Sequence, residues 1–302
     1  MDYSRIIHES FRIAWEHKSL WIFGVFVSGG AAFNFDPTPF GWEGGEDLPW
    51  GLSPGMLENW QPSWEVILPL VALVGSIVLL SIILSFIAYP ALIDGANKIK
   101  RGGVYTFSSS FSAGLDFFFR FVGLTIVFAV VTVVATLITV LLAIGAFKVS
   151  PILGGLYLVV AIPVAIAGMF STTTVYYLAE RVIVLRNATI GDGISEGILL
   201  LRQNVVPCIL IALISIGLAL GIAIVTFVAS LLFSIPFAAI GALSGLGLIP
   251  AILMSVLIGL PLSIVVGGYV GASMTNLYTL FYIELVEPSK PLSSPAPLQP
   301  AG

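Results

Sequence analysis

The chain has 302 residues, of which 58% are apolar and only 9% carry a charge. An ordinary soluble domain has about 25% charged residues, so this composition excludes a water-soluble globular protein and indicates that lipid surrounds most of the chain. The net charge is −4, and the single cysteine, Cys208, cannot form an internal disulfide. We expect membrane lipids as the surroundings and no nucleic-acid partner.

The first predicted element is a helix that lies on the membrane surface. Residues 3–18 carry apolar side chains at helical spacing on one face and charges on another. They lead straight into an uncharged run, Ser19–Phe35, which is short for a membrane span. We therefore expect the helix to turn into the bilayer here, with Lys18 at the water boundary and Trp15 and Trp21 at the depth of the headgroups.

Four longer uncharged runs follow, and each exceeds the roughly 20 residues that a helix needs to cross the hydrocarbon core. They are Val66–Ile93, Phe121–Phe147, Val149–Ala179 and Gln203–Ile283. The last run is long enough for two or three spans. We divide it into a helix at about 205–233, an apolar outer connection at 234–250 and a last helix from Ala251, with a kink at Pro261 and the pair Gly267-Gly268. Three spans also fit by length and would place the C-terminus outside.

Positive charges give the orientation, because Lys and Arg near membrane ends stay in the cytoplasm. Ten of them lie before the first run, between the second and third runs, or between the fourth and fifth runs, whereas the intervening segments carry only Lys148. Residues 34–65 contain no Lys or Arg and several acids. The N-terminus is therefore expected in the cytoplasm and the loop 34–65 outside.

Three segments resemble one another and predict an internal repeat. Segments starting at Tyr3, Phe107 and Ile190 share apolar positions at i, i+4, i+8 and i+11, and each has a small residue at the same place. These small residues are Ser10, Gly114 and Gly197. In the third copy Thr189 is expected to cap the helix, with Asp192 three residues on.

The even-numbered spans repeat as well, because each places a tyrosine shortly before an acid. The pairs are Tyr89 and Asp94, Tyr176 and Glu180, and Tyr278 and Glu284. Since the first two pairs lie on the cytoplasmic side, the third is expected there too. This favours six spans with both termini in the cytoplasm.

The predicted fold class is therefore an all-α polytopic membrane protein with six transmembrane helices in three hairpins. Each hairpin is preceded by a cytoplasmic amphipathic surface helix, which makes an internal threefold repeat. The units are residues 1–106, which include the outer loop 34–65, then 107–189 and 190–287. A proline-rich tail, 288–302, is expected to be disordered.

No catalytic, cofactor-binding or metal-binding constellation is predicted. The two histidines, His8 and His17, are nine residues apart and lie on opposite faces of a helix. No metal-ligand spacing occurs. No lipid-embedded Asp, Glu, Lys, Arg or His is expected in the interior of a span, where pumps and proton-coupled carriers normally have one. We therefore expect a protein that is not an enzyme.

The best candidate binding site is a girdle of polar side chains at the cytoplasmic ends of the even spans. If these spans pack around a pseudo-threefold axis, the girdle lines a pocket for a lipid headgroup or another amphipathic molecule. The alternative is an ordinary tyrosine belt with hydroxyl bonds between helices, which is the commoner arrangement. The candidate residues are Tyr89, Thr173, Tyr176, Asn276 and Tyr278.

Two further features have alternatives that the sequence leaves open. In the outer loop, Glu43, Glu46 and Asp47 are suited to a divalent cation, although the loop's tryptophans are more typical of an anchor on the outer leaflet. The spacings Gly267-x-x-x-Gly271 and Gly241-x-x-x-Gly245 permit close helix packing, either within the chain or in an oligomer.

Two stretches carry a resemblance to a known family. "SFRIAWEHKSLWIFGVF" near the N-terminus and "AERVIVLRNATIGDGISEGILLLRQN" between the fourth and fifth spans resemble a bacterial group of six-span proteins known as the membrane domain of glycerophosphoryl diester phosphodiesterase. The resemblance implies a multi-pass protein of the bacterial plasma membrane. The soluble phosphodiesterase domain is absent from this sequence, so no catalytic residue is carried over.

Two functions follow as hypotheses. The first is a non-enzymatic scaffold, anchor or accessory subunit whose cytoplasmic surface helices contact a protein partner. The second is a transporter or a lipid- or amphipath-handling protein that uses the girdle as its site. The transporter hypothesis requires Thr173, Tyr176, Asn276 and Tyr278 to face one another around a cavity.

Overall fold

A computed structural model describes residues 1–28, 63–244, 253 and 255–287. Over these residues the chain is 92% helical and contains no strand. Most of the outer loop, part of the predicted connection 234–250 and the tail 288–302 lie outside the described residues, and so do the acids Glu43, Glu46 and Asp47.

The described residues form eight α-helices and one π-helical turn. They are α1 (Tyr3–Glu16), α2 (Leu20–Val27), α4 (Trp64–Lys100), α5 (Phe107–Val149), α6 (Pro151–Arg186), α7 (Ile190–Gln203), α8 (Val205–Ser244), the turn η2 (Ser255–Gly259) and α10 (Leu260–Val286). Among the described residues, five helices are long and apolar enough to cross a membrane, namely α4, α5, α6, α8 and α10. The all-helical, multi-pass class predicted from the sequence is therefore found.

Side-chain caps fix where several helices begin. The Asp2 carboxylate accepts the backbone N–H of Arg5 at 3.1 Å at the start of α1. At α7 the Thr189 hydroxyl oxygen accepts the N–H of Asp192 at 3.3 Å, which is the predicted cap. Between α6 and α7 the chain turns through Asn187, which has a positive φ of 51°, a conformation that asparagine tolerates better than most residues.

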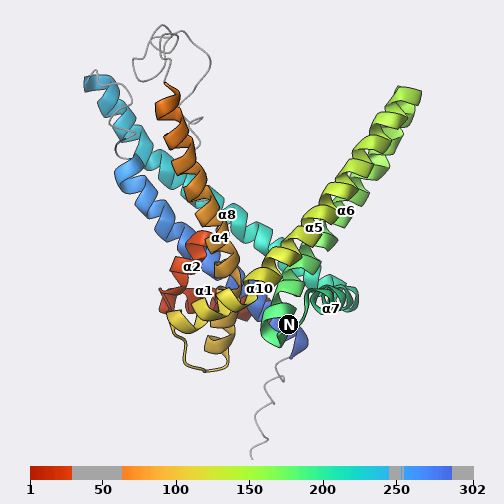
Figure 1. Ribbon diagram of the computed structural model, residues 1–302, viewed down its shortest axis with the longest axis horizontal. Helices are drawn as coiled ribbons and strands as arrows, with labels where there is room; N and C mark the ends of the chain where they lie inside the picture. Colours follow the sequence, from red (N-terminus) through yellow and green to blue (C-terminus); the bar gives the residue numbers. More distant parts are fainter. Residues whose placement is uncertain (29–62, 245–252, 254, 288–302) are drawn as a thin grey trace, which may run out of the picture.

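The helices form two arms that diverge from a common base (Figure 1). One arm is the antiparallel pair α5 and α6, and the other contains α4 and α10. α8 leaves the base beside α7 and runs toward the tip of the α4–α10 arm. The amphipathic helices α1 and α7 lie at the base, where α1 packs on α10 and α7 packs on α6.

The buried core lies at the base rather than along the arms. It contains Ile6 and Ala14 of α1, Leu20 and Phe23 of α2, and Leu277 of α10, among others. Farther out, the arms expose apolar side chains over most of their length. In water such surfaces would be unfavourable, so the surroundings that this fold requires are acyl chains.

Small residues allow α2 and α10 to touch backbone to backbone. A Cβ atom added at Gly24 would lie 2.8 Å from the backbone N of Ala272, and it would also clash with the carbonyl of Gly268. Gly271 packs on Gly24 in turn. The glycines near 267–271 therefore serve packing within the chain, through Gly268 and Gly271. Gly241 lies in α8, but its packing and the whole of Gly245 lie outside what the structure describes.

The three small residues that the sequence aligns, Ser10, Gly114 and Gly197, are all buried against another helix. Ser10 lies against α10, where the Asn276 side-chain amide donates to its carbonyl at 3.5 Å. A Cβ at Gly114 would meet Ala91 of α4 at 3.3 Å, and one at Gly197 would meet the carbonyl of Val175 of α6 at 3.1 Å. α1, the first part of α5 and α7 therefore each pack on a neighbouring helix through the small residue that the sequence aligns.

Several boundaries differ from the predicted ones. The second surface helix is not separate, because Phe107–Val149 is one continuous helix. α8 continues through Pro236 to Ser244, so the first part of the predicted outer connection is helical. The predicted kink at Pro261 and the pair Gly267-Gly268 stays a prediction; a π-helical turn, η2, immediately precedes α10, which runs as one helix through these residues.

The pairing of the last helix also differs from a simple hairpin. α10 lies mainly against α2, α1 and α4 and touches α8 at only a few positions. The glycine contact contributes to this arrangement, because it allows the backbones of α10 and α2 to approach closely.

Trp15 and Trp21, predicted at headgroup depth, form an aromatic group with Tyr269 of α10. Their ring centroids lie 5.8 Å and 5.4 Å from that of Tyr269. The Trp21 indole N–H donates to the carbonyl of Ala14 at 2.6 Å, which uses a carbonyl that the end of α1 leaves free. This bond fixes the angle between α1 and α2.

Candidate functional site

The five predicted girdle residues do not share one pocket. Tyr89 of α4 is half-buried and its hydroxyl donates to the carbonyl of Val27 at 3.4 Å. Asn276 is fully buried against α1. Tyr278 stacks on Tyr177 of α6, with ring centroids 4.6 Å apart. Only Thr173 and Tyr176 line a cavity.

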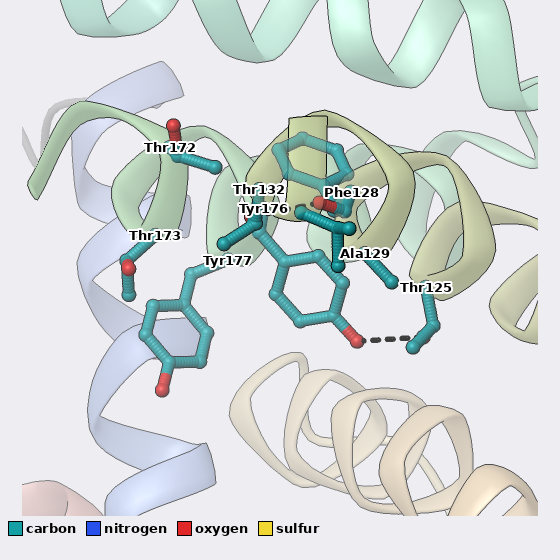
Figure 2. A pocket seen from close by; sticks show the side chains of 9 residues that line it. Thr125, Phe128, Ala129, Thr132, Thr172, Thr173, Tyr176 and Tyr177 are labelled. Carbon is teal, nitrogen blue, oxygen red and sulfur yellow. Dashed lines mark hydrogen bonds between the residues drawn. The ribbon is translucent and has the colours of Figure 1, made fainter. Parts of the chain in front are cut away.

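That cavity lies between α5 and α6 and has a volume of about 370 Å³ (Figure 2). Its lining side chains are Thr125, Phe128, Ala129, Thr132, Val133, Thr172, Thr173, Tyr176 and Tyr177. Volumes of this size are at the small end of ligand pockets. Of the predicted girdle, Thr173 and Tyr176 line this cavity, and Tyr278 stacks on Tyr177, which also lines it.

The tyrosine that forms one wall of this cavity is held from two sides. The Tyr176 hydroxyl and the Thr125 hydroxyl are 3.0 Å apart and share a hydrogen bond, which Figure 2 draws as a dashed line. The ring of Phe128 meets the ring of Tyr176 edge to face at 5.3 Å. These contacts fix the wall in place before any ligand arrives.

Next to the cavity, α6 carries a buried ion pair that the sequence did not reveal. Glu180 and Arg181 are 0% and 1% exposed. The Arg181 guanidinium donates to Glu180 Oε2 at 2.5 Å and to the carbonyl of Tyr177 at 3.0 Å. Its Cζ atom also lies 5.5 Å and 5.6 Å from the ring centroids of Tyr177 and Tyr278, both within the range of cation–π attraction.

This pair lies just beyond the predicted uncharged run and is buried by protein rather than exposed to lipid. The uncharged run ends at Ala179, but α6 continues to Arg186, and the core of the base covers the turn that carries Glu180 and Arg181. The signal available in the sequence was an acid and a base side by side after two tyrosines. A buried charge inside a membrane bundle is a functional-site candidate by default.

Three buried polar atoms at this junction have no hydrogen-bond partner among the described residues. They are Glu180 Oε1, Arg181 Nε and Asn276 Oδ1. Unsatisfied polar atoms cost free energy when they are buried. The junction between α6, α10 and α1 is therefore polar and tightly enclosed, and it joins the two arms at the base.

Ion pairs tie the surface helices and helix ends together around this junction. Arg5 of α1 pairs with Glu284 of α10 at 3.0 Å, and Lys100 at the end of α4 pairs with Glu9 of α1 at 2.6 Å. On the other side Arg186 of α6 pairs with Glu196 of α7. These links hold α1 and α7 at fixed positions on the base.

Tyr105, in the connection between α4 and α5, lies outside the membrane-spanning segments. Burial raises the pKa of its phenol, and the hydrogen bond from the Ser19 hydroxyl at 3.3 Å opposes this rise. The ring of His17 packs edge to face on Tyr105 at 5.7 Å. This contact ties the turn between α1 and α2 to the α4–α5 connection.

Within the described ranges, no group of three or more His, Cys, Asp or Glu residues could hold a metal ion. Comparisons with family models, with curated proteins and with solved structures give no match for this chain. The resemblance stated for the two sequence stretches above therefore stays a prediction, and the function has to be argued from the geometry.

Proposed function

We propose that this protein is a membrane-embedded scaffold or accessory subunit that presents its two amphipathic helices to a protein partner. The observation that carries the proposal is the ion-paired base. Charged links fix α1 and α7 on the bundle, while residues such as Arg12 and Glu16 on the outer face of α1 are more than half exposed. A polar surface held at a fixed position suits the docking of a protein.

The topology that we propose has six crossings, with α2 as part of the first crossing and both termini in the cytoplasm. The packing of the surface helices supports a threefold repeat. The surface helix of each unit packs on the even-numbered span of the unit before it, and the third unit counts as the one before the first. In order, α1 packs on α10, the start of α5 on α4, and α7 on α6. The first of these contacts joins residues 266 positions apart, so chain connectivity does not impose it.

A labelling experiment tests this topology. Ser294→Cys in a Cys208→Ala background places one cysteine in the tail. In intact cells the tail should resist an impermeant thiol reagent and should react after the cells are opened. Labelling in intact cells would contradict a cytoplasmic C-terminus and the six-span count. We also propose the bacterial plasma membrane as the location, on the resemblance and the distribution of Lys and Arg.

The scaffold proposal is tested by recovery of partners. Gentle detergent extraction with crosslinking should repeatedly recover the same protein, and Arg12→Glu on the outer face of α1 should weaken its recovery. Lys148→Glu is the matched control. It makes the same charge change on an exposed side chain, but at the C-terminal end of α5, far from α1 in the sequence. Repeated recovery of the chain alone would count against a scaffold, as would equal losses in the two variants.

A second candidate, a lipid- or amphipath-handling function, is favoured by the cavity between α5 and α6. Native mass spectrometry with endogenous lipid retained tests it. A bound lipid that Thr173→Val weakens would support this function. A chain that never retains lipid in excess of the detergent background would count against it.

A further inference from the structure

Threonines and tyrosines are prominent among the residues that line the cavity between α5 and α6, and the hydroxyls of Tyr176 and Thr125 meet there (Figure 2). Four of its nine lining residues are threonines, two are tyrosines and none is charged. The surrounding surface of both helices is aliphatic, with Val130 56% and Met169 74% exposed. The cavity is thus an uncharged, mainly apolar site that adds a few hydroxyl groups to a surface that otherwise suits acyl chains.

In the topology proposed above, the cavity lies between the cytoplasmic end of α5 and the middle of this helix. Arg120, whose guanidinium donates to the Asn187 side chain at 2.6 Å, is the last charged residue before the apolar part of α5 and is taken as the boundary. Thr125 lies five residues further along α5 and Thr132 twelve, which correspond to about 7 Å and about 18 Å of helix rise. A charged headgroup would have to leave the interface to enter so deep a site.

The lining offers hydrogen bonds but no charge. The Thr132 hydroxyl donates to the carbonyl of Phe128 at 2.8 Å, which leaves its oxygen as an acceptor. Thr125 and Tyr176 share one bond, and Tyr176 also interacts with the Glu180 carboxylate, so their hydroxyl oxygens are left chiefly as acceptors for a ligand hydroxyl. A phosphate or a carboxylate at this depth would lose its hydration without gaining a cation. The ligand that fits is uncharged and carries both hydroxyl and ester oxygens.

The walls are formed before a ligand arrives. Tyr176 is held by Phe128 and Thr125, and Tyr177 is held between Tyr278 and the buried guanidinium of Arg181. A pre-formed wall reduces the entropy cost of binding. These contacts distinguish the cavity from the bare apolar surface on either side of it.

We propose that this cavity binds an uncharged glycerolipid, whose hydroxyl and ester oxygens meet the threonine and tyrosine hydroxyls while its acyl chains lie along the exposed faces of α5 and α6. A membrane lipid can enter laterally, because the cavity opens on the surface of two spans. The proposal specifies the ligand of the second candidate function and does not depend on the scaffold.

The test uses the full chain in nanodiscs with two photoreactive probes. One is a diacylglycerol with a diazirine in an acyl chain, and the other is a phosphatidylglycerol with the same chains. After irradiation, the diacylglycerol should label residues 125–133 and 172–177 several-fold more than other exposed stretches of α5 and α6. The phosphatidylglycerol should show no such preference.

Two pairs of variants make the test specific. Ala129→Phe fills the cavity and should abolish the preferential labelling, whereas Ala135→Phe, on another face of the same helix and equally exposed, should leave it intact. Thr132→Val should weaken labelling by about three- to tenfold. Thr139→Val is the control. The Thr139 hydroxyl also donates to a carbonyl of its own helix, that of Ala135 at 2.8 Å, but it does not line the cavity, so its removal should leave the labelling unchanged.

The outcomes separate the two ideas. Equal preferential labelling by both probes would overturn the restriction to an uncharged lipid but would leave an amphipath site. Even labelling along α5 and α6, unchanged by Ala129→Phe, would overturn the site itself and with it the second candidate function. Should Ala129→Phe fail to fold in a thermal melt, the Thr132 and Thr139 variants decide in the same way.

Discussion

Arg181→Met is the substitution whose effect the structure predicts most sharply. It removes a fully buried guanidinium and leaves the carboxylate of Glu180, which is 0% exposed, without its partner. It also removes the cation from between the rings of Tyr177 and Tyr278. The methionine side chain is apolar and of similar length, so the change is chiefly one of charge and hydrogen bonding.

The expected loss is large for a single residue. Removing one partner of a buried pair costs about 3–5 kcal/mol, because the other charge stays buried and unpaired. The loss of the cation–π contacts adds about 0.5–2 kcal/mol. The double variant Glu180→Gln, Arg181→Met carries no buried charge, so it should be clearly more stable than Arg181→Met alone.

The assay is reversible unfolding in mixed micelles, with helicity followed as the denaturing detergent is increased. Arg12→Met is the control, since Arg12 and Glu16 form an exposed pair at 3.9 Å that should be worth less than about 1 kcal/mol. Two results would refute the reasoning. One is an Arg181→Met protein that is as stable as wild type. The other is a double variant whose loss of stability equals the sum of the losses in Glu180→Gln and Arg181→Met measured separately.

Three further predictions concern stability. Gly24→Ala should destabilise by about 1–3 kcal/mol, because its methyl would meet the backbone of Gly268, whereas Gly75→Ala, with nothing within 4 Å, should be nearly neutral; equal melting temperatures would contradict the contact between α2 and α10. The pKa of Tyr105 is raised, so the stability that its neutral phenol contributes is complete below about pH 10 and is lost as the pH rises. In a pH series of thermal melts, Tyr105→Phe should therefore lose less stability at alkaline pH than wild type. Parallel curves for the two proteins would contradict this expectation. Thr189→Ala removes the cap of α7 and should cost about 1 kcal/mol in the micelle assay, an expectation that an unchanged midpoint would sink.

Local signals in the sequence predicted the local features of the fold. The Thr189 cap, the amphipathic segments of α1 and α7 and the long apolar helices all depend on residues within one or two turns of one another. The glycines near 267–271 were recognised as packing residues, but their partner was left open. Gly24 could not be identified as that partner, because the contact joins segments more than 240 residues apart.

The candidate site was predicted only in part. Thr173 and Tyr176 do line a cavity, but its other wall comes from Thr125 and Thr132 of α5, which look in the sequence like ordinary hydroxyls in an apolar run. Asn276 faces α1, where its amide donates to the carbonyl of Ser10, and Tyr278 stacks on Tyr177 of α6, which itself lines the cavity.

By itself, then, the sequence determined the solvent and the class of this protein, because composition and hydropathy act residue by residue: too few charges for water, and helices long enough for lipid. The tertiary structure alone decided that Glu180 and Arg181 are buried and that α5 and α6 enclose a cavity. Burial of a side chain and the shape of a cavity depend on which helices meet and at what angle. Contacts between backbones far apart in the chain, such as Gly24 on Gly268, set that geometry.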